Sequence, residues 1–463
     1  MLVAVCGLSL IGVLSGARPA RAADAQERVE QLEREVQALK AEVARLSAAR
    51  PAVQPAAPVP AAELAEIERR LEILAEEVER LKLGEAAAAA DQPAHGLGPA
   101  ASKVYRAKTG VSIGGYGEAV YENFAAHRED GSPSGLADQT DLRRAVVYFG
   151  YRWNEKYLFN SELEFEHAVA ASDKEGEAEM EFAYVDRLFR PGANLRAGLV
   201  LMPVGLINEL HEPTVFLGVD RPLTEELVIP TTWREVGVGV YGETRNLAYR
   251  SYVTNSLDAA RFSGEEGLAE GKGEGSQSRA RDLAWSGRLD FTGVPGLLAG
   301  GSLFAGRTGQ GLRGADGRAI GARTTLGELH VDWRWRGLQL RGLLARAAIS
   351  DAAALDRALG LAGGESIGSR LAGGYLEAGF NLFSLRPRGE PSLVPYVRWE
   401  RVDTQDEVPS GYERDPANDR RLLTLGLAYK PIDALVVKAD WRRERTAART
   451  GVDRFALSLG YVF

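Results

Sequence analysis

The last nine residues of the chain, Phe455–Phe463, alternate between large apolar side chains and small or polar ones. A period of two predicts a β-strand whose two faces meet different surroundings. A strand with one face in lipid places aromatic residues at the water interface, which explains an aromatic carboxyl terminus. The pattern favours a membrane barrel, with the edge strand of a soluble sandwich as the alternative. Tyr461 and Phe463 are the expected C-terminal barrel signature, through which barrel-assembly machinery would bind the chain.

The same alternation recurs from about residue 103 to the end. Five runs show it most clearly: 157–166, 283–291, 329–335, 423–429 and 435–441. In several of them an aromatic residue stands at one end of the apolar face, where a girdle at the lipid headgroups would lie. At about 20 to 24 residues for each strand with its loop, residues 103–463 would form about 16 antiparallel strands, the size of a porin with an aqueous channel.

The charged faces of these runs decide between the two all-β folds. In a sandwich, the polar faces meet outside water and the apolar faces meet the other sheet. A closed barrel reverses this arrangement, because apolar faces meet lipid and charged faces line a wet interior. Closure also leaves no unpaired backbone donors in lipid. The expected fold is therefore an all-β transmembrane barrel in the bacterial outer membrane, spanning residues 103–463.

The region before the barrel has three expected parts. Residues 1–22 resemble an export signal, with an apolar stretch and an Ala20–Arg21–Ala22 cleavage site. Residues 24–83 carry apolar residues at heptad spacing and predict a periplasmic α-helical coiled coil, broken by a Pro/Ala tract at 50–62. A solvated amphipathic helix is the alternative. Residues 84–102 are expected to form a linker.

Composition excludes several other classes of protein. No apolar run of about 20 residues follows the amino terminus, as a helical membrane protein would need. The single cysteine, Cys6, lies inside the export signal, so no disulfide or thiolate metal site is expected in the mature chain. The formal net charge of -8 argues against a nucleic-acid partner. Glycine is abundant, with 52 residues, as strands that bend or pack closely require.

Several motifs resemble the phosphate-selective porin O and P family. They are Gly114–Glu118, Arg143–Phe149, Pro395–Glu400 and the long stretch from Pro203 to Glu235. The resemblance covers nearly all of residues 103–463. It implies a trimeric, 16-stranded outer-membrane barrel with one long loop folded inward to narrow the pore. Some members of that family also carry a periplasmic coiled coil before the barrel.

The stretch from Met202 to Glu235 is the expected inward loop, because it is too long for a tight turn and carries apolar residues that favour packing against the wall. A plain external loop is the alternative. Mixed charges across a narrow gap would sort solutes by size and charge. The constriction candidates are Glu209, Glu212, Asp220, Arg221, Glu225, Glu226, Arg234 and Glu235.

Alternation also predicts which charged residues face the interior of the barrel. The pore-lining candidates are Arg144, Glu162, Glu164, Glu166, Arg196, Arg288, Arg334, Arg398, Lys438 and Arg442. Lysine is scarce in this region, so no dense lysine cluster for phosphate is expected. Arginine suits both carboxylate and phosphate groups. The expected solutes are small hydrophilic anions such as phosphate or organic acids, with a weak anion preference.

Two matches to enzyme motifs lack the required context. Gly237–Gly242 fits G-x-G-x-x-G inside a strand-like run, and Gly364–Gly368 fits G-x-S-x-G in a glycine-rich loop. The five histidines are scattered, so neither a metal site nor a cofactor is expected. The sequence predicts a non-enzymatic, homotrimeric porin for passive diffusion. The alternatives are a structural barrel that tethers envelope layers through its coiled coil, and a barrel lipase or protease.

Overall fold

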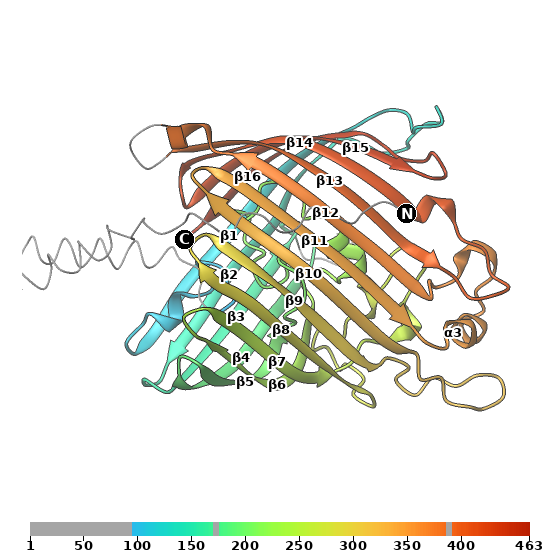
Figure 1. Ribbon diagram of the computed structural model, residues 1–463, viewed down its shortest axis with the longest axis horizontal. Helices are drawn as coiled ribbons and strands as arrows, with labels where there is room; N and C mark the ends of the chain where they lie inside the picture. The colour runs from blue at the N-terminus through green and yellow to red at the C-terminus, as the bar shows by residue number, and fades with distance from the viewer. Residues whose placement is uncertain (1–94, 170–175, 386–390) are drawn as a thin grey trace, which may run out of the picture. The chain divides into compact units, whose positions relative to one another are not determined.

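The computed structural model describes residues 95–169, 176–385 and 391–463. Within them, sixteen antiparallel strands close into one barrel in which every strand pairs with its neighbours in chain order (Figure 1). The strands are β1 (Gly110–Phe124), β2 (Gln139–Arg152), β3 (Tyr157–Glu166), β4 (Ala178–Arg190), β5 (Ala193–Leu201), β6 (Arg234–Glu243), β7 (Leu247–Asn255), β8 (Leu283–Val294), β9 (Leu297–Arg307), β10 (Arg323–Trp335), β11 (Leu338–Ile349), β12 (Arg370–Phe380), β13 (Ser392–Glu407), β14 (Asp419–Ile432), β15 (Leu435–Thr446) and β16 (Arg454–Val462). The expected barrel and its strand number are confirmed.

The regions expected before the barrel fall mostly outside this description. The export signal (1–22), the heptad segments (24–83) with their Pro/Ala tract (50–62) and most of the linker (84–102) lie outside the described residues.

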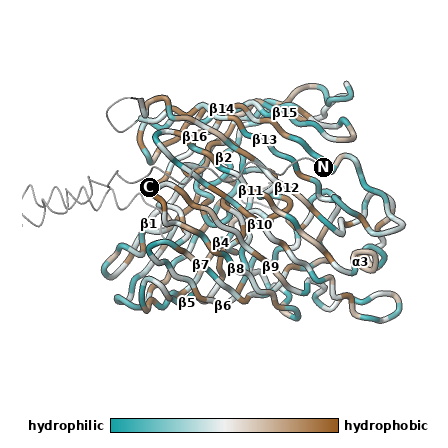
Figure 2. The backbone as a smooth tube through the Cα atoms, viewed as in Figure 1, coloured by the Kyte–Doolittle hydropathy of each residue, from teal (hydrophilic) through white to brown (hydrophobic). Residues whose placement is uncertain are grey.

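Alternation along the strands separates an apolar outer face from an interior face. In β16, Phe455, Leu457 and Leu459 are 40–48% exposed, whereas Ala456 is fully buried and Ser458 is 4% exposed. Hydrophobic and hydrophilic positions also alternate along several other strands (Figure 2). The outer face carries large exposed apolar side chains around the barrel, including Ile113, Phe149, Leu289, Leu344, Leu376 and Trp399. A barrel wall in lipid has this distribution.

Closure of the barrel depends on the carboxyl terminus. β16 pairs with β1 from Tyr116↔Val462 to Phe124↔Arg454. Phe463 extends the ladder, because it donates to the Gly115 carbonyl at 2.8 Å and accepts from the Gly115 N–H at 2.9 Å. These bonds remove the free strand edges that a sandwich would retain, so the sandwich alternative is excluded.

The connections differ in length at the two ends of the barrel. The end with the carboxyl terminus has mostly short turns, such as 191–192, 295–296, 336–337 and 433–434. The other end has long connections, one of which contains helix α3 (Ala352–Leu359; Figure 1). Among the described residues, no helix is long and apolar enough to cross a membrane.

Three stretches of chain pack inside or across the barrel. The connection between β5 and β6, hereafter the inward segment (residues 202–233), is almost wholly buried. Its apolar residues share a core with interior residues of the wall, as Trp233 does with Phe304 at a ring-centroid distance of 4.8 Å. Residues 256–282 cover it, with the Leu268 N–H donating to the Leu227 carbonyl at 3.2 Å. Residues 95–106 pack against the strands near the end of the barrel that has the short turns.

Candidate functional site

The backbone of the inward segment is held by charged side chains of the wall. Five cations donate to its carbonyl oxygens: Arg288 to Gly205, Lys430 to Thr214 at 2.6 Å, Arg341 to Val215 at 3.1 Å, Lys438 to Gly218 at 2.7 Å and Arg398 to Asp220 at 3.2 Å. Two carboxylates accept from its N–H groups, Asp440 from Val219 at 2.8 Å and Glu400 from Leu223 at 2.7 Å. Three predicted pore-lining residues, Arg288, Arg398 and Lys438, thus support the segment and are almost fully buried.

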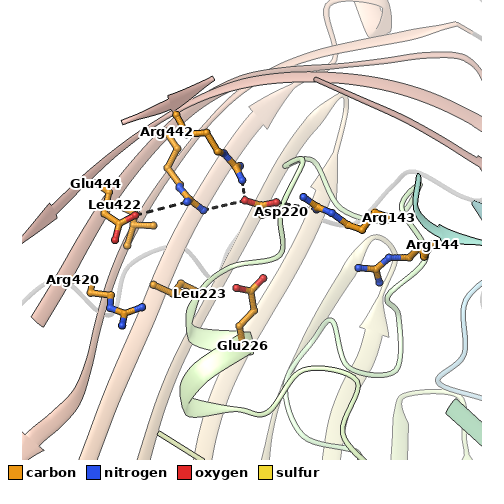
Figure 3. A pocket seen from close by; sticks show the side chains of 10 residues that line it. Arg143, Arg144, Asp220, Leu223, Glu226, Arg420, Leu422, Arg442 and Glu444 are labelled. Atoms are coloured by element: carbon orange, nitrogen blue, oxygen red, sulfur yellow. Dashed lines mark hydrogen bonds and ion pairs between the residues drawn. The ribbon is translucent and has the colours of Figure 1, made fainter. Parts of the chain in front are cut away.

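Asp220 is the point where the inward segment meets a group of arginines, hereafter the Asp220 centre. Arg143 and Arg442 each approach its carboxylate at 3.0 Å from opposite sides (Figure 3). Arg454 forms a third ion pair with it. One carboxylate therefore faces three guanidinium groups from strands β2, β15 and β16. Burial opposes its ionisation, but these three arginines hold the pKa of Asp220 well below its usual range.

A cavity of about 390 Å³ opens beside the Asp220 centre. Its charged lining consists of five arginines and three carboxylates: Arg143, Arg144, Arg420, Arg442 and Arg454 against Asp220, Glu226 and Glu444 (Figure 3). The lining has an excess of two positive charges when all groups are ionised. Burial and the nearby Asp220 carboxylate raise the pKa of Glu226 to about 7, so its charge changes near neutral pH. The arrangement can hold a small anion among guanidinium groups.

His211 is the centre of an opposite arrangement, hereafter the His211 centre. Its Nε2 atom lies 3.1 Å from Glu162 of β3 and 3.2 Å from Glu181 of β4. Its Nδ1 atom lies 2.9 Å from the carbonyl of Asn208. Burial alone would lower the pKa of His211, but the two carboxylates outweigh it and raise the pKa to about 10. Glu164 lies beside Glu181, so a third buried carboxyl group adjoins the two that contact the imidazole.

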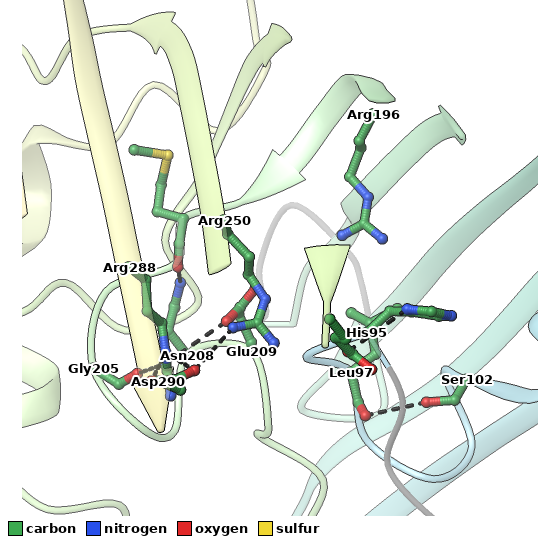
Figure 4. Close-up of polar contacts among 12 residues, drawn as sticks. His95, Leu97, Ser102, Arg196, Gly205, Asn208, Glu209, Arg250, Arg288 and Asp290 are labelled. Carbon is green, nitrogen blue, oxygen red and sulfur yellow. Dashed lines mark hydrogen bonds and ion pairs between the residues drawn. The ribbon is translucent and has the colours of Figure 1, made fainter. Parts of the chain in front are cut away.

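Glu209 joins the inward segment to strands β7 and β8. Its carboxylate lies 3.2 Å from Arg250 and 3.7 Å from Arg288, and Arg250 also pairs with Asp290 at 3.2 Å (Figure 4). Burial raises the pKa of Glu209, although both arginines oppose this effect. All four side chains are buried, so this network holds the segment in place and does not line the cavity.

Glu212 joins the inward segment to residues 95–106. Its Oε1 atom accepts from the backbone N–H groups of Ala100 and Ala101 at 3.0 and 3.1 Å. Asn160 of β3 binds the Ala101 carbonyl at 3.0 Å, and Ser102 closes the turn onto Leu97 (Figure 4). Burial raises the pKa of Glu212 to about 7, since the two N–H groups compensate only in part.

Glu225 connects the two halves of the inward segment. It accepts from the Ile207 N–H and the Tyr375 hydroxyl, both at 2.7 Å. Gly205 adopts a φ of +81°, and a Cβ atom there would lie 2.5 Å from Glu225, so this close approach requires glycine. Burial raises the pKa of Glu225.

The other predicted constriction residues also have structural partners. Arg221 donates to Thr232 at 2.9 Å, Arg234 pairs with Glu179, and Glu235 accepts from the Gly273 N–H at 2.9 Å. Of the eight candidates, the cavity lining contains only Asp220 and Glu226. The remaining six hold the segment in its position.

The remaining pore-lining candidates divide between the two centres and the ends of the barrel. Arg442 and Arg144 line the cavity, while Glu162 and Glu164 belong to the His211 centre. Arg196 is buried against Asp186 at 2.9 Å. Arg334 lies at the end of β10 with a side chain that is 56% exposed, and the half-buried Glu166 ends β3. Neither end residue contacts the cavity.

One known relative shows which family this chain belongs to. An uncharacterized protein of Aquifex aeolicus (strain VF5) is 38% identical over 380 residues, which cover 80% of this chain and 84% of that protein. The chain belongs to the family of that protein. No protein-family model matches the chain.

Solved structures show a fold similar to that of this chain. The structure of a loop deletion mutant of OmpT, an outer membrane protein of Vibrio cholerae, superposes with a TM-score of 0.50, at 10% identity, over 77% of this chain and 100% of that chain. Salmonella typhi OmpF in complex with daunomycin superposes with a TM-score of 0.51, at 11% identity, over 77% of this chain and 98% of that chain. The fold is that of a porin.

Three arginines of the cavity are absent from the residues predicted from the sequence. Arg420 and Arg454 follow the alternation of β14 and β16, so the same pattern extended by one step could have found them. Arg143 lies at a bulge, because β1 and β2 change register between Glu118 and Ala119. The bulge turns Arg143 and Arg144 to the same side, which no alternating pattern predicts.

Proposed function

We propose that this chain is an outer-membrane porin that forms a water-filled channel for passive diffusion of small hydrophilic anions, such as phosphate or small organic acids. The protein would act as a homotrimer in outer-membrane lipid, with the heptad segments in the periplasm. The β16 terminus, with Tyr461 and Phe463, would direct its insertion by barrel-assembly machinery.

The observation that carries this proposal is the charge of the cavity lining. Five arginines face three carboxylates there, and guanidinium groups pair with carboxylate and phosphate oxygens through two parallel hydrogen bonds. Three of the arginines share a single counter-charge in Asp220. Incoming anions would compensate the excess, whereas cations would meet a positive lining. Support for the membrane location comes from the apolar outer face of the barrel.

The test is conductance in planar lipid bilayers with the purified, refolded chain. We expect stepwise channel openings, and a reversal potential across a tenfold KCl gradient that indicates a weak preference for chloride. Added phosphate is expected to reduce the chloride current. A heat-denatured sample serves as the control for detergent leaks. A clear preference for potassium would contradict the proposal.

A second function is a structural barrel that anchors the envelope through the expected coiled coil. The dense packing of the interior favours it, because residues 95–106, 202–233 and 256–282 all bury side chains inside or across the barrel. Bilayers that contain folded barrels but show no current would support this second function over the first.

A further inference from the structure

The His211 centre lies outside the cavity lining, so the proposed passage of anions does not explain why these side chains are brought together. We propose that His211, Glu162 and Glu181 bind a divalent transition-metal ion, for which Zn²⁺ is the reference, and that this ion fixes the inward segment to strands β3 and β4. The site would be a structural one, distinct from the proposed path of the solute.

The geometry of the three side chains suits a metal ion. One ligand atom from each residue lies within 4.8 Å of the others, and all three residues are buried. The His211 Nε2 atom is 3.1 Å from Glu162 Oε1 and 3.2 Å from Glu181 Oε2. Ligand atoms at about 2.0 Å from a tetrahedral zinc ion are about 3.3 Å apart. The two nitrogen–oxygen distances are therefore already close to those around a tetrahedral ion.

The hydrogen bond at the other ring nitrogen prepares His211 as a ligand. When Nδ1 donates to the Asn208 carbonyl at 2.9 Å, the neutral imidazole has its lone pair on Nε2, directed at the two carboxylates. Metal-ligating histidines commonly have a backbone carbonyl or carboxylate at the second nitrogen, which fixes the tautomer and ring orientation. The turn that contains Asn208 thus positions the proposed ligand.

The carboxylates around His211 provide a second, independent observation. Within the described chain, Glu162 Oε2 and Glu164 Oε1 are buried side-chain oxygens without a hydrogen bond, and Glu181 Oε2 has only the approach of His211 Nε2 at 3.2 Å. Glu162, Glu164 and Glu181 are each at most 1% exposed. Buried carboxylate oxygens are costly to leave unmatched, and metal coordination is one of the ways in which proteins compensate them.

The local charge balance favours a divalent ion. Within ion-pair distance, Arg144 lies 3.8 Å from both Glu118 and Glu164, and His211 lies 3.1 and 3.2 Å from Glu162 and Glu181. Four carboxyl groups thus share two close cationic partners. A divalent ion bound by His211, Glu162 and Glu181 would add positive charge at this point.

The ligand types restrict the metal. One imidazole nitrogen with two or three carboxylate oxygens suits Zn²⁺, Mn²⁺, Fe²⁺, Co²⁺ or Ni²⁺. Calcium and magnesium prefer sites composed of oxygen ligands alone. The proposal therefore predicts selectivity for a transition metal over the divalent ions abundant outside the cell.

A second buried histidine offers a matched control. His330 lies 2.8 Å from Glu328 through Nδ1 and 2.9 Å from Asp290 through Nε2. Its two carboxylates bind different ring nitrogens, and Arg288 lies 3.3 Å from Nε2. These contacts form a chain of ion pairs. The two carboxylates lie at opposite nitrogens of the ring, so they cannot share one metal ion with a single nitrogen. The substitution His330→Gln should therefore leave metal binding unchanged.

The experiment measures bound zinc in the full-length chain, refolded in detergent, stripped with a chelator and dialysed against Zn²⁺. We expect one Zn²⁺ per chain, with X-ray absorption at the zinc edge showing one imidazole and oxygen neighbours at about 2.0 Å. His211→Gln should weaken binding at least tenfold, and His330→Gln should not. Excess Ca²⁺ or Mg²⁺ should not displace the zinc.

Several results would overturn the proposal. They are zinc that never reaches one equivalent, an absorption spectrum without imidazole, and equal binding by the His211 and His330 variants. If His211→Gln does not fold, the wild-type stoichiometry and spectrum decide alone, with Glu181→Gln as the second variant. Because binding is measured in detergent without a membrane current, failure of the channel proposal leaves this result unaffected.

Discussion

The two centres of the inward segment meet the barrel wall with opposite charge arrangements. At the Asp220 centre, one carboxylate of the segment faces three arginines of the wall. At the His211 centre, one imidazole of the segment faces the carboxyl groups of Glu162 and Glu181 of the wall, and Glu164 lies beside Glu181. Both centres attach the same stretch of chain, and His211 and Asp220 are only nine positions apart in the sequence.

The two centres differ in how far their charged side chains are open to solvent. The Asp220 centre borders a cavity of about 390 Å³, and Asp220 and Arg442 keep side-chain exposures of 13% and 20%. A charge excess beside water can act on passing solutes. The His211 centre is sealed, with His211 and Glu162 at most 2% exposed as side chains, so its excess must be matched by a proton or a metal ion. Similar ion-pair chemistry thus attaches the segment in both places, but only the Asp220 centre also borders a cavity that solvent can enter.

The largest expected effect comes from reversing the charge of the cavity. The double substitution Arg420→Glu with Arg442→Glu changes the lining from an excess of two positive charges to an excess of two negative charges. We expect the reversal potential in a KCl gradient to change sign, from anion to cation preference. Arg421→Glu is the matched control, because Arg421 lies on the same strand with a side chain that is 60% exposed. Unchanged selectivity in the double variant would mean that ions do not pass through this cavity.

The next effect is on stability at the Asp220 centre. Asp220→Asn leaves three arginines without their shared counter-charge, and we expect a loss of about 2 kcal/mol in the free energy of unfolding, because the cavity's water moderates the usual cost. Urea unfolding in lipid vesicles measures it. The exposed pair of Asp316 with Arg318 is the control, and Asp316→Asn should cost less than about 0.5 kcal/mol.

The same variant has a defined pH dependence. Since the folded pKa of Asp220 is depressed, its contribution is present above the ordinary pKa of an aspartate and is lost as the pH falls through the depressed value. The stability difference between wild type and Asp220→Asn should therefore shrink in acid. A difference that instead grows on acidification would contradict the ion-pair account.

The sequence predicted the wall of the barrel better than its interior. In the runs where alternation is clear, it identified which side of the strand carries apolar residues, because a strand has a fixed period of two. It also assigned Arg442, Glu162 and Arg398 to the interior face; in the structure Glu162 and Arg398 are buried and Arg442 lines the cavity. Tertiary contacts then determine the role of each charge, so a predicted pore-lining residue such as Arg398 donates to the inward segment at the Asp220 carbonyl.

Irregularities of the strands explain what the sequence did not predict. Glu181 and Phe182 are adjacent in β4 yet both are buried, because the pairing of β3 with β4 shifts register between Glu162 and Leu163. A bulge of this kind cannot be read from hydrophobic periodicity. The positions of the five histidines in the sequence therefore did not reveal the His211 centre, because its three side chains come from three separate parts of the chain.

A smaller effect should sharpen the role of the cavity near neutral pH. The pKa of Glu226 is raised to about 7, so acidification from pH 8 to pH 6 neutralises it and adds one positive charge to the lining. We expect the anion preference to increase over this interval. The variant Glu226→Gln should show the higher anion preference at both pH values, so that the change between pH 8 and pH 6 disappears. Glu444→Gln, at the same cavity, should raise the preference but retain that change.

The smallest effect concerns the attachment beside the His211 centre. Glu212 accepts two backbone N–H groups through a single oxygen, Oε1, so the amide oxygen of Glu212→Gln can accept both. We expect this variant to change the free energy of unfolding by less than about 1 kcal/mol. Glu212→Leu leaves both N–H groups of Ala100 and Ala101 buried without a partner, at a cost of about 2 kcal/mol. Equal destabilisation by the two variants would mean that packing volume, and not hydrogen bonding, joins residues 95–106 to the inward segment.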